Sequence, residues 1–298
     1  MKEEVSALRE AFGREGYIAD ESIATAVFLA GDMRRPLLVE GDAGVGKTEI
    51  AKVLARHLGA ELIRLQCYEG LDVAAALYEW NYPKQLLRLR GHAGAGAAVE
   101  SDDAIYSRDF LLERPLLRAI TCKAGPPVLL IDEVDRADEG FEAFLLELLS
   151  DFQVTIPELG TVKAEHIPHV LLTSNGTREL SDALRRRCLY LYVEHPTLEK
   201  EVRILRARVP AAAEHLAQEI GRFLQALRAR KLVRMPGVAE SIDWARALVR
   251  LHCDHLDVPT VQATLGCLIK DRHDQRDLGR DELDRLVRGA QATAEVRA

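Results

Sequence analysis

Short apolar runs alternate with longer amphipathic stretches between about residue 36 and residue 193. This alternation is typical of a parallel sheet whose strands are joined by crossover helices. Several of the runs are apolar throughout, which indicates strands that are buried on both faces. The predicted strands are 37–39, 62–65, 128–131, 170–173 and 189–193. We therefore predict an α/β fold with a five-stranded parallel sheet flanked by helices.

The strand pattern ends at His195-Pro196, and the remainder of the chain is helical in pattern. This shift predicts an α/β domain over residues 1–195 and an all-helical domain over residues 196–298. Within the first domain, residues 152–164 form two β-rich arms around a Pro-Glu-Leu-Gly turn, which predicts a hairpin insertion. A predicted helix carries Phe141, Leu145 and Leu148 on one stripe, with Asp138 as its N-cap.

The composition is that of a globular protein, with 48% hydrophobic and 29% charged residues. A net charge of −7 argues against a general nucleic-acid binder, because such proteins usually carry a basic excess. The five cysteines are scattered and form no C-x-x-C pair, so neither a disulfide framework nor a zinc site is indicated. With no apolar core of a signal peptide and no run long enough to span a bilayer, we expect a cytoplasmic protein.

The strongest motif follows the first predicted strand and precedes a helical stretch. It is a complete G-x-x-x-x-G-K-T sequence, here called the phosphate loop: Gly41, Asp42, Ala43, Gly44, Val45, Gly46, Lys47 and Thr48. A glycine-rich turn at a helix start aims backbone N–H groups at one point, where the helix dipole also favours anions. Lys47 adds charge for the β- and γ-phosphates, and the Thr48 hydroxyl is placed to hold Mg²⁺. The motif predicts that the chain binds a nucleoside triphosphate.

Two carboxylates, Asp132 and Glu133, end the apolar strand 128–131. Such a strand delivers both to the carboxyl edge of the sheet, where open α/β folds bind ligands. We expect Asp132 to hold Mg²⁺ and Glu133 to polarise the water that attacks the γ-phosphate. A helix cap or a solvated turn would explain a single aspartate, but not this pair beside a phosphate loop.

Two further sites are suggested by their positions. The strand 170–173 leads to Asn175, whose amide would orient the lytic water if this strand lies beside the phosphate-loop strand. An asparagine in an ordinary turn is the alternative. Arg185, Arg186 and Arg187 precede the last predicted strand. They form either a solvated basic patch or an arginine finger that reaches the nucleotide of a neighbouring subunit.

Taken together, these motifs resemble those of AAA+ ATPases. The hairpin before Asn175 and the extra segment after the second strand are similar to the MoxR branch. Within that branch, the segments 66–72, 78–87 and 110–116 resemble CoxD-type accessory ATPases of molybdenum-containing carbon monoxide dehydrogenases and related hydroxylases. The resemblance covers nearly the whole chain and implies a P-loop AAA+ core with a C-terminal helical lid.

The resemblance also implies residue roles. Lys47 and Thr48 would bind ATP and Mg²⁺, and Arg187 would be the finger, with Arg186 as the reserve candidate. Tyr17 and Ile18 occupy the segment that usually lines the adenine pocket. The lid departs from the family pattern, because residues 237–241 read Gly-Val-Ala-Glu-Ser where many relatives carry a small residue followed by Pro-Arg. Arg234 is a possible substitute for the lid arginine.

The implied activity is Mg²⁺-dependent ATP hydrolysis by a hexameric ring that remodels or matures a client metalloenzyme, such as a molybdenum hydroxylase. The resemblance further implies a partner protein with a von Willebrand A domain. The alternative is an AAA+ motor or loader acting on DNA, with a basic face that includes Arg222, Arg228, Arg230, Lys231 and Arg234. A small-molecule kinase is disfavoured because no acceptor pocket is apparent, and GTP is disfavoured because no N-K-x-D motif occurs.

The segment 66–87 has two interpretations. Tyr78, Trp80 and Tyr82 alternate like one face of a strand, which favours either plain packing or an element that faces a substrate or the ring.

The phosphate loop leads to a direct test. Lys47→Ala should abolish nucleotide binding, because the phosphates lose their main side-chain charge. Equilibrium binding of a fluorescent ATP analogue measures the effect. Lys52→Ala, on the same predicted helix, serves as the control. Near-normal affinity in Lys47→Ala would show that the loop is not the nucleotide site.

Overall fold

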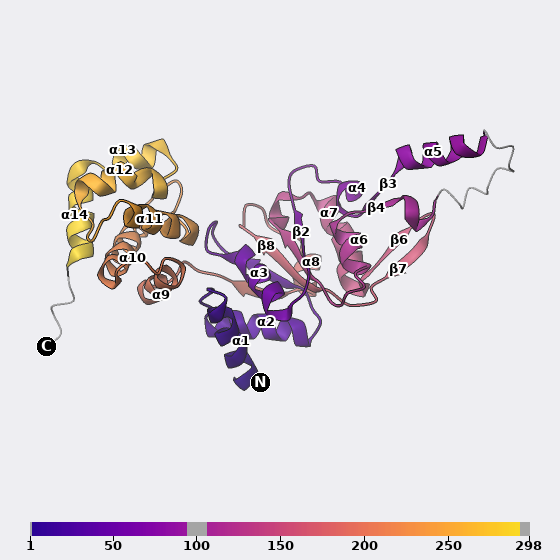
Figure 1. The fold of residues 1–298 in the computed structure, drawn as a ribbon, viewed down its shortest axis with the longest axis horizontal. Helices are drawn as coiled ribbons and strands as arrows, with labels where there is room; N and C mark the ends of the chain where they lie inside the picture. Colours follow the sequence, from indigo (N-terminus) through magenta and orange to yellow (C-terminus); the bar gives the residue numbers. More distant parts are fainter. Residues whose placement is uncertain (1, 94–105, 293–298) are drawn as a thin grey trace. The chain divides into compact units, whose positions relative to one another are not determined.

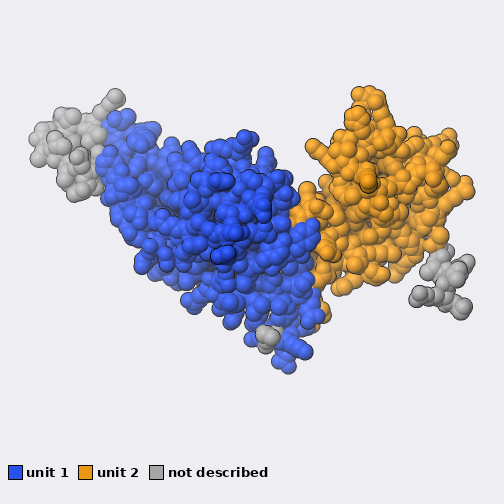
Figure 2. Space-filling view, turned by 180° about the vertical axis from the view of Figure 1, so that it is seen from behind, with its two compact units in different colours: residues 1–8, 21–40, 48–192 blue, residues 9–20, 41–47, 193–298 orange. Residues whose placement is uncertain are grey.

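A computed structural model describes residues 2–93 and 106–292. The chain divides into two compact units, coloured separately in Figure 2. Unit 1 comprises residues 1–8, 21–40 and 48–192, and unit 2 comprises residues 9–20, 41–47 and 193–298. The predicted division after residue 195 is close to the last of these changes. Segments 9–20 and 41–47 lie before residue 195 in sequence but belong to unit 2, together with the C-terminal helices.

Unit 1 is built on a five-stranded parallel sheet. Its strands are β1 (Leu37–Glu40), β2 (Leu62–Gln66), β5 (Val128–Asp132), β8 (His169–Ser174) and β9 (Leu189–Tyr192). The spatial order is β2-β5-β8-β1-β9, and every pairing is parallel. All five strands were predicted from the apolar runs. Every residue of β5 is buried, as expected of a central strand covered on both faces.

Helices flank this sheet (Figure 1). They are α2 (Glu21–Asp32), α3 (Lys47–Leu58), α6 (Pro115–Ile120), α7 (Glu139–Asp151) and α8 (Asp182–Arg187), together with the 3₁₀ turn η3 (Val134–Arg136). Helix α1 (Lys2–Arg14) is divided between the units, because its residues from 9 onward belong to unit 2. The predicted apolar stripe of α7 is confirmed, since Phe141, Leu145 and Leu148 belong to the same buried core as the sheet residue Ile131. Asp138 caps α7 by accepting a hydrogen bond from the backbone N–H of Phe141 at 2.8 Å.

Two small sheets are inserted into unit 1. The predicted hairpin is present as β6 (Gln153–Ile156) and β7 (Gly160–Lys163), an antiparallel pair. The other pair is β3 (Tyr78–Trp80) and β4 (Leu111–Glu113). The short elements α4 (Val73–Ala76) and η2 (Arg108–Phe110) directly precede β3 and β4, and α5 (Tyr82–Ala93) follows β3.

The predicted alternation of Tyr78, Trp80 and Tyr82 is wrong at its last member. Trp80 is buried and packs edge-on against Tyr78 and Tyr106, with ring centroids 6.0 Å and 5.3 Å away. Tyr82 instead begins α5 and is 58% exposed, because the Asn81 side chain accepts a hydrogen bond from a first-turn N–H and starts the helix there. Turn chemistry therefore overrides the period-two pattern.

The C-terminal part of unit 2 is helical, as predicted. Its helices are α9 (Leu198–Arg208), α10 (Glu214–Arg228), α11 (Val238–Arg250), α12 (Val258–Leu268), α13 (Arg272–Asp277) and α14 (Arg280–Gln291). Their apolar faces meet in one core around Phe223 and Trp244, whose ring centroids are 5.2 Å apart. The buried indole N–H of Trp244 donates to the Thr264 hydroxyl at 2.8 Å, so burial leaves this donor satisfied. None of the described helices is long and apolar enough to cross a membrane.

A buried ionic network joins α9, α10 and α11. The Arg228 guanidinium donates to both carboxylate oxygens of Glu201, at 2.6 and 2.9 Å, and the two side chains are 7% and 1% exposed. The Ser241 hydroxyl donates to Glu201 as well, at 2.9 Å. Arg228 also donates to the backbone carbonyl of Pro236 at 3.0 Å, which fixes the turn that leads into α11. A buried charge pair is tolerated only when its remaining donors and acceptors are satisfied, as they are here.

This network predicts a large stability loss on removing one partner. Arg228→Met should lower the free energy of unfolding by about 3–5 kcal/mol, because the Glu201 carboxylate would stay buried without its cation. The chain has two tryptophans. Trp80→Phe therefore leaves the fluorescence of Trp244, in the core of unit 2, as the readout of urea unfolding.

The control is Arg246→Met, which removes an exposed ion pair with Asp243 and should cost less than about 1 kcal/mol. Adding Glu201→Gln to Arg228→Met should recover part of the loss. Equal losses for Arg228→Met and Arg246→Met would contradict the assignment.

Candidate nucleotide-binding site

The phosphate loop takes the backbone shape that its glycines permit. Gly41, Gly44 and Gly46 have φ values of +155°, +81° and +97°. At Gly41 a Cβ atom would lie 2.2 Å from the carbonyl oxygen of Val193, so a side chain cannot be accommodated. Lys47 is 7% exposed, and its ammonium donates to the carbonyls of Gly41 and Asp42 at 2.6 and 2.7 Å. The Lys47 side chain thus folds back over the start of the phosphate loop.

The remaining loop residues have distinct surroundings. Val45 is buried, whereas Ala43 and Asp42 are exposed. The Asp42 carboxylate lies 3.3 Å from the His195 ring, and burial is the main cause that lowers the pKa of this histidine. At neutral pH His195 is therefore neutral, and it leaves the net charge of the loop unchanged.

The segment predicted to line the adenine pocket lies in the same compact unit as the phosphate loop. The Tyr17 ring would be 3.8 Å from a Cβ atom at Gly46, and it packs edge-on against Phe12 with ring centroids 6.0 Å apart. Ile18, the next residue, is partly buried. An aromatic ring beside the loop that is predicted to hold phosphates is suitably placed to contact the nucleoside.

The start of helix α11 lies directly on the phosphate loop. The backbone N–H of Val238 donates to the carbonyl of Gly44 at 2.8 Å. A Cβ atom at Gly237 would be 2.6 Å from the Gly44 Cα atom, so these two backbones can approach only because both residues are glycine. Ser241 is buried in the Arg228–Glu201 network, and Arg234 lies on the exposed turn before the helix.

In unit 1, Asp132 connects three neighbouring elements. Its Oδ1 accepts from the hydroxyl of Thr48, the second residue of α3, at 3.0 Å, and from that of Thr173 on β8 at 2.5 Å. Its Oδ2 accepts from two nitrogens of Arg64, on β2, at 3.1 and 2.6 Å. The side chain is 4% exposed, so these bonds replace the water that a buried carboxylate loses. Thr48 and Asp132, which were each predicted to hold Mg²⁺, therefore lie within hydrogen-bond distance of each other.

Glu133 is presented by a strained backbone. It has a φ of +55°, which is uncommon for a residue with a side chain, and its N–H donates to the Thr173 hydroxyl at 2.9 Å. Its carboxylate is 34% exposed and lies 3.1 Å from Arg136. One threonine hydroxyl therefore fixes both Asp132 and Glu133. The sequence analysis assigned no role to Thr173. Its position at the end of the strand that leads to Asn175 could have indicated one.

The loop that carries Asn175 is anchored by a second buried carboxylate. β8 lies between β5 and β1, so Asn175 follows the strand that neighbours the phosphate-loop strand, as predicted. Asp135 accepts from the backbone N–H of Asn175 at 3.2 Å and from the N–H and hydroxyl of Thr177 at 2.9 and 2.6 Å. Asp135 was not predicted. Its other oxygen is buried without a hydrogen-bond partner in the described structure.

Arg186 and Arg187 are both exposed at the end of α8. The Arg187 side chain donates to the Ser150 hydroxyl on α7 at 2.6 Å and to the carbonyl of Ala183 at 3.1 Å. The backbone of the same segment is held by Arg35, which donates to the carbonyls of Arg186 and Arg187 at 2.8 and 3.4 Å. The structure therefore fixes the position of this segment, while the Arg187 guanidinium remains at the surface.

Cys67, beside this site, is not a nucleophile at neutral pH. Its N–H donates to the carbonyl of Asp132 at 2.8 Å, and burial raises the pKa of its thiol to about 12. In unit 1, Thr48, Asp132 and Glu133 supply a hydroxyl and two carboxylates. Oxygen groups of these kinds take part in phosphoryl transfer.

A protein-family model supports the same class. The model described as AAA domain (dynein-related subfamily) matches residues 36–188, slightly more than half of the chain. The chain therefore belongs to this family of AAA domains, and the family implies nucleotide binding and hydrolysis.

Similar proteins span a range of named activities. The gas vesicle ATPase GvpN of Haloferax mediterranei is 25% identical over 275 residues, covering 88% of this chain and 76% of that protein. GvpN1 of Halobacterium salinarum is 27% identical over 67% of this chain, which spans only 58% of the relative's length. The mitochondrial chaperone protein ClpB3 of Oryza sativa is 27% identical over 178 residues, covering 56% of this chain and 16% of that protein.

Among solved structures, the RuvB Holliday junction branch migration motor of Thermotoga maritima has 18% sequence identity and a TM-score of 0.45. The match covers 86% of this chain and 69% of that one.

The double role of Thr173 can be tested with an isosteric change. Thr173→Val should lower the turnover of ATP by roughly 10-fold, since each lost hydrogen bond to a charged group is worth about 1.5–3 kcal/mol. ATP affinity should change less, because the phosphate loop is intact. Steady-state kinetics separate the two effects. Thr161→Val on the exposed hairpin is the control, and unchanged turnover in Thr173→Val would remove Thr173 from the site.

Proposed function

We propose that this protein hydrolyses ATP in a Mg²⁺-dependent reaction and uses the energy to remodel a client protein. The hydroxyl of Thr48 and the carboxylate of Asp132, 3.0 Å apart, carry the first part of the proposal. Both are hard oxygen ligands, and they meet immediately after the lysine of the phosphate loop. They fit Mg²⁺, which would neutralise charge on the phosphates when bound.

The remaining roles follow from position. Lys47 and the backbone N–H groups of the phosphate loop bind the phosphates, and Tyr17 with Ile18 contacts the adenine. Glu133 accepts a proton from the attacking water, and Asn175 orients that water. The partial exposure of Glu133 leaves its carboxylate accessible to a water molecule.

We further propose that the active protein is a ring of identical subunits, with six as the expected number. Arg187 supports this, because its guanidinium is exposed on a segment whose backbone is held in place. A finger on the surface of one subunit can complete the site of the next through a heterologous interface, which forms a ring when the rotation between subunits closes. Arg186 is the reserve finger. We also propose that this ring is cytoplasmic.

The proposed client is a metalloenzyme, with a molybdenum hydroxylase such as carbon monoxide dehydrogenase as the specific candidate. The MoxR-like and CoxD-like segments support this assignment, and a von Willebrand A-domain partner is proposed on the same basis. Relatives named as gas vesicle ATPases and as a chaperone support the coarser idea of work on other proteins. Within the CoxD-like segments, α5 extends away from the sheet and exposes Tyr82, Leu86 and Leu87, which makes it the proposed client-facing element (Figure 1).

A trapping experiment tests the client. Glu133→Gln should keep ATP binding but slow hydrolysis strongly, because an amide cannot accept the proton of the attacking water. The trapped ring should then retain its client during purification, and mass spectrometry identifies it. The matched control is Glu133→Gln combined with Lys47→Ala, which should retain nothing.

A deletion strain provides the second arm. The client polypeptide should be present, while its metal centre, measured by elemental analysis, should be incomplete. Normal metal content and activity would contradict the metalloenzyme assignment but leave the ATPase proposal standing.

The alternative function, a motor acting on DNA, was based on a predicted basic face, and several arginines of that face have partners within the protein. Arg228 is buried against Glu201, and Arg230 forms an ion pair with Glu282. Arg222 donates to the backbone carbonyl of Ala290. The predicted basic face is thus reduced to fewer free charges, on a chain of net charge −7. Salt-sensitive DNA binding in the presence of an ATP analogue would restore this alternative.

The finger can be tested by mixing variants. Arg187→Ala alone should slow hydrolysis by about 10³-fold or more with little change in ATP affinity, since a finger acts on the transition state. Mixing it with Lys47→Ala should restore part of the activity, because some interfaces then join an intact loop to an intact finger.

Ser150→Ala is the matched control, because it removes the contact of Arg187 within its own subunit and keeps the guanidinium. A defect as large as that of Arg187→Ala, or no recovery in mixed rings shown to form, would give Arg187 a structural role. A larger defect in Arg186→Ala would move the finger by one residue.

A further inference from the structure

A cavity of about 440 Å³ lies in unit 1 at the amino-terminal end of the sheet, where β1 begins at Leu37 and β8 begins at His169. This is the opposite end of the strands from Asp132 and Asn175, so the cavity is not part of the site described above. Its volume is within the range of pockets that hold small molecules.

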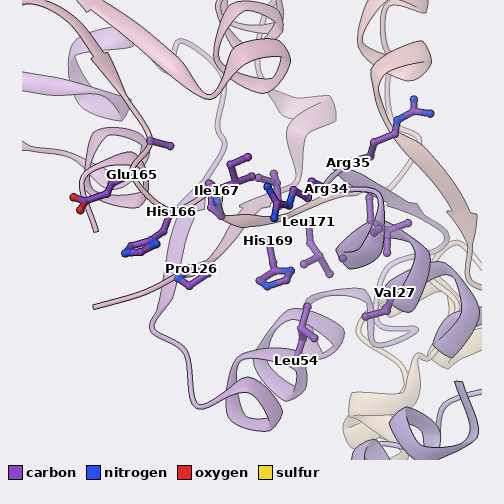
Figure 3. A pocket seen from close by; sticks show the side chains of 16 residues that line it. Val27, Arg34, Arg35, Leu54, Pro126, Glu165, His166, Ile167, His169 and Leu171 are labelled. Atoms are coloured by element: carbon purple, nitrogen blue, oxygen red, sulfur yellow. The ribbon is translucent and has the colours of Figure 1, made fainter. Parts of the chain in front are cut away.

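The lining combines an apolar wall with cationic groups. Val27, Leu54 and Leu171 supply apolar surface, and Arg34, Arg35 and two histidines supply polar groups. Figure 3 shows Glu165 and His166 on one side of the cavity and Arg34 near its centre, beside Ile167, while the Arg35 side chain extends away from these residues. Glu165 is the one carboxylate among the lining residues, so the two guanidinium groups leave a positive balance even when both histidines are neutral.

Arg34 lies at the exposed edge of this lining. Within the part of the chain that the structure describes, its guanidinium makes no hydrogen bond and no ion pair, in contrast to Arg35. Its backbone has a φ of +51°, two residues after α2 ends at Asp32. His169 adds a ring against Gly31, and burial lowers the pKa of this ring, which leaves a neutral N–H donor at neutral pH.

We propose that this cavity binds a small organic anion, with a carboxylate or phosphate group on Arg34 and an apolar body against Leu54 and Leu171. A guanidinium fork binds either oxyanion through paired hydrogen bonds. The apolar wall favours a ligand with a hydrocarbon or ring portion over a bare inorganic ion.

The same cavity adjoins the segment of the proposed finger. Arg35 lines the cavity and donates to the carbonyls of Arg186 and Arg187 at 2.8 and 3.4 Å. The next residue, Pro36, accepts from the N–H of Leu189 at 2.8 Å. An anion that reached Arg35 as well as Arg34 would compete with these carbonyls and so alter the anchoring of the finger segment. On the proposed ATPase function, the cavity would then be an effector site for ATP hydrolysis.

Calorimetric titration tests binding independently of any ATPase activity. The probes are phenylphosphonate and benzoate, with benzamide as the uncharged match, and they are added to Lys47→Ala so that the phosphate loop does not compete for anions. At least one anion should bind in the millimolar range or tighter, and benzamide should not. The stronger of the two anions distinguishes a phosphate-bearing from a carboxylate ligand.

Variants locate the binding. Arg34→Gln should weaken it by roughly 10-fold or more, since it removes a charge-assisted contact. Ala30→Leu, which narrows the cavity without changing charge, should weaken it as well. Arg108→Gln, an exposed arginine away from the cavity, should have no effect. Failure of both anions to bind, or equal binding by Arg34→Gln and the parent, would overturn the site.

ATP turnover measures the coupling between the cavity and the finger segment. In the chain with Lys47 intact, saturating anion should change ATP turnover at least about twofold, and Arg34→Gln should abolish the change. A change that persists in Arg34→Gln arises at the phosphate loop and contradicts the coupling. Binding with no change in turnover would overturn the coupling through Arg35 while leaving the anion site.

Discussion

The arrangement of unit 1 depends on one buried carboxylate, that of Asp132. A carboxylate that loses its water at the end of a central strand must receive hydrogen bonds from the protein, or its burial costs several kcal/mol. Asp132 receives them from Thr48 on α3, Thr173 on β8 and Arg64 on β2. Satisfying one side chain therefore sets the register of three elements around the point where a metal ion would be held.

Thr173 also positions Glu133, the residue after Asp132. The Thr173 hydroxyl donates to Asp132 and accepts from the N–H of Glu133, so the strained backbone of Glu133 is stabilised by the group that holds its neighbour. Asp135 does the equivalent for the Asn175 loop. The two residues with proposed roles toward water are thus positioned by buried polar side chains, Thr173 and Asp135.

In unit 2 the controlling constraint is steric instead of electrostatic. Gly41 leaves no room for a Cβ atom beside Val193, and Gly44 meets the backbone of Gly237. The first turn of α11 lies on the phosphate loop, and Ser241 in this turn joins the buried network of Arg228 and Glu201.

The sequence by itself determined the strands, the helical C-terminal region, the hairpin and the residues of the phosphate loop, because these depend on local patterns of apolar residues and on backbone conformations that only glycine adopts readily. It also placed Asp132 at the carboxyl edge of the sheet, because that residue follows an apolar strand. It misjudged Tyr82, where helix capping by Asn81 outweighed the alternating pattern. Only the tertiary structure decided the roles of Thr173, Asp135 and Arg35, and the burial of Arg228, because these depend on which residues distant in sequence are brought within hydrogen-bond reach.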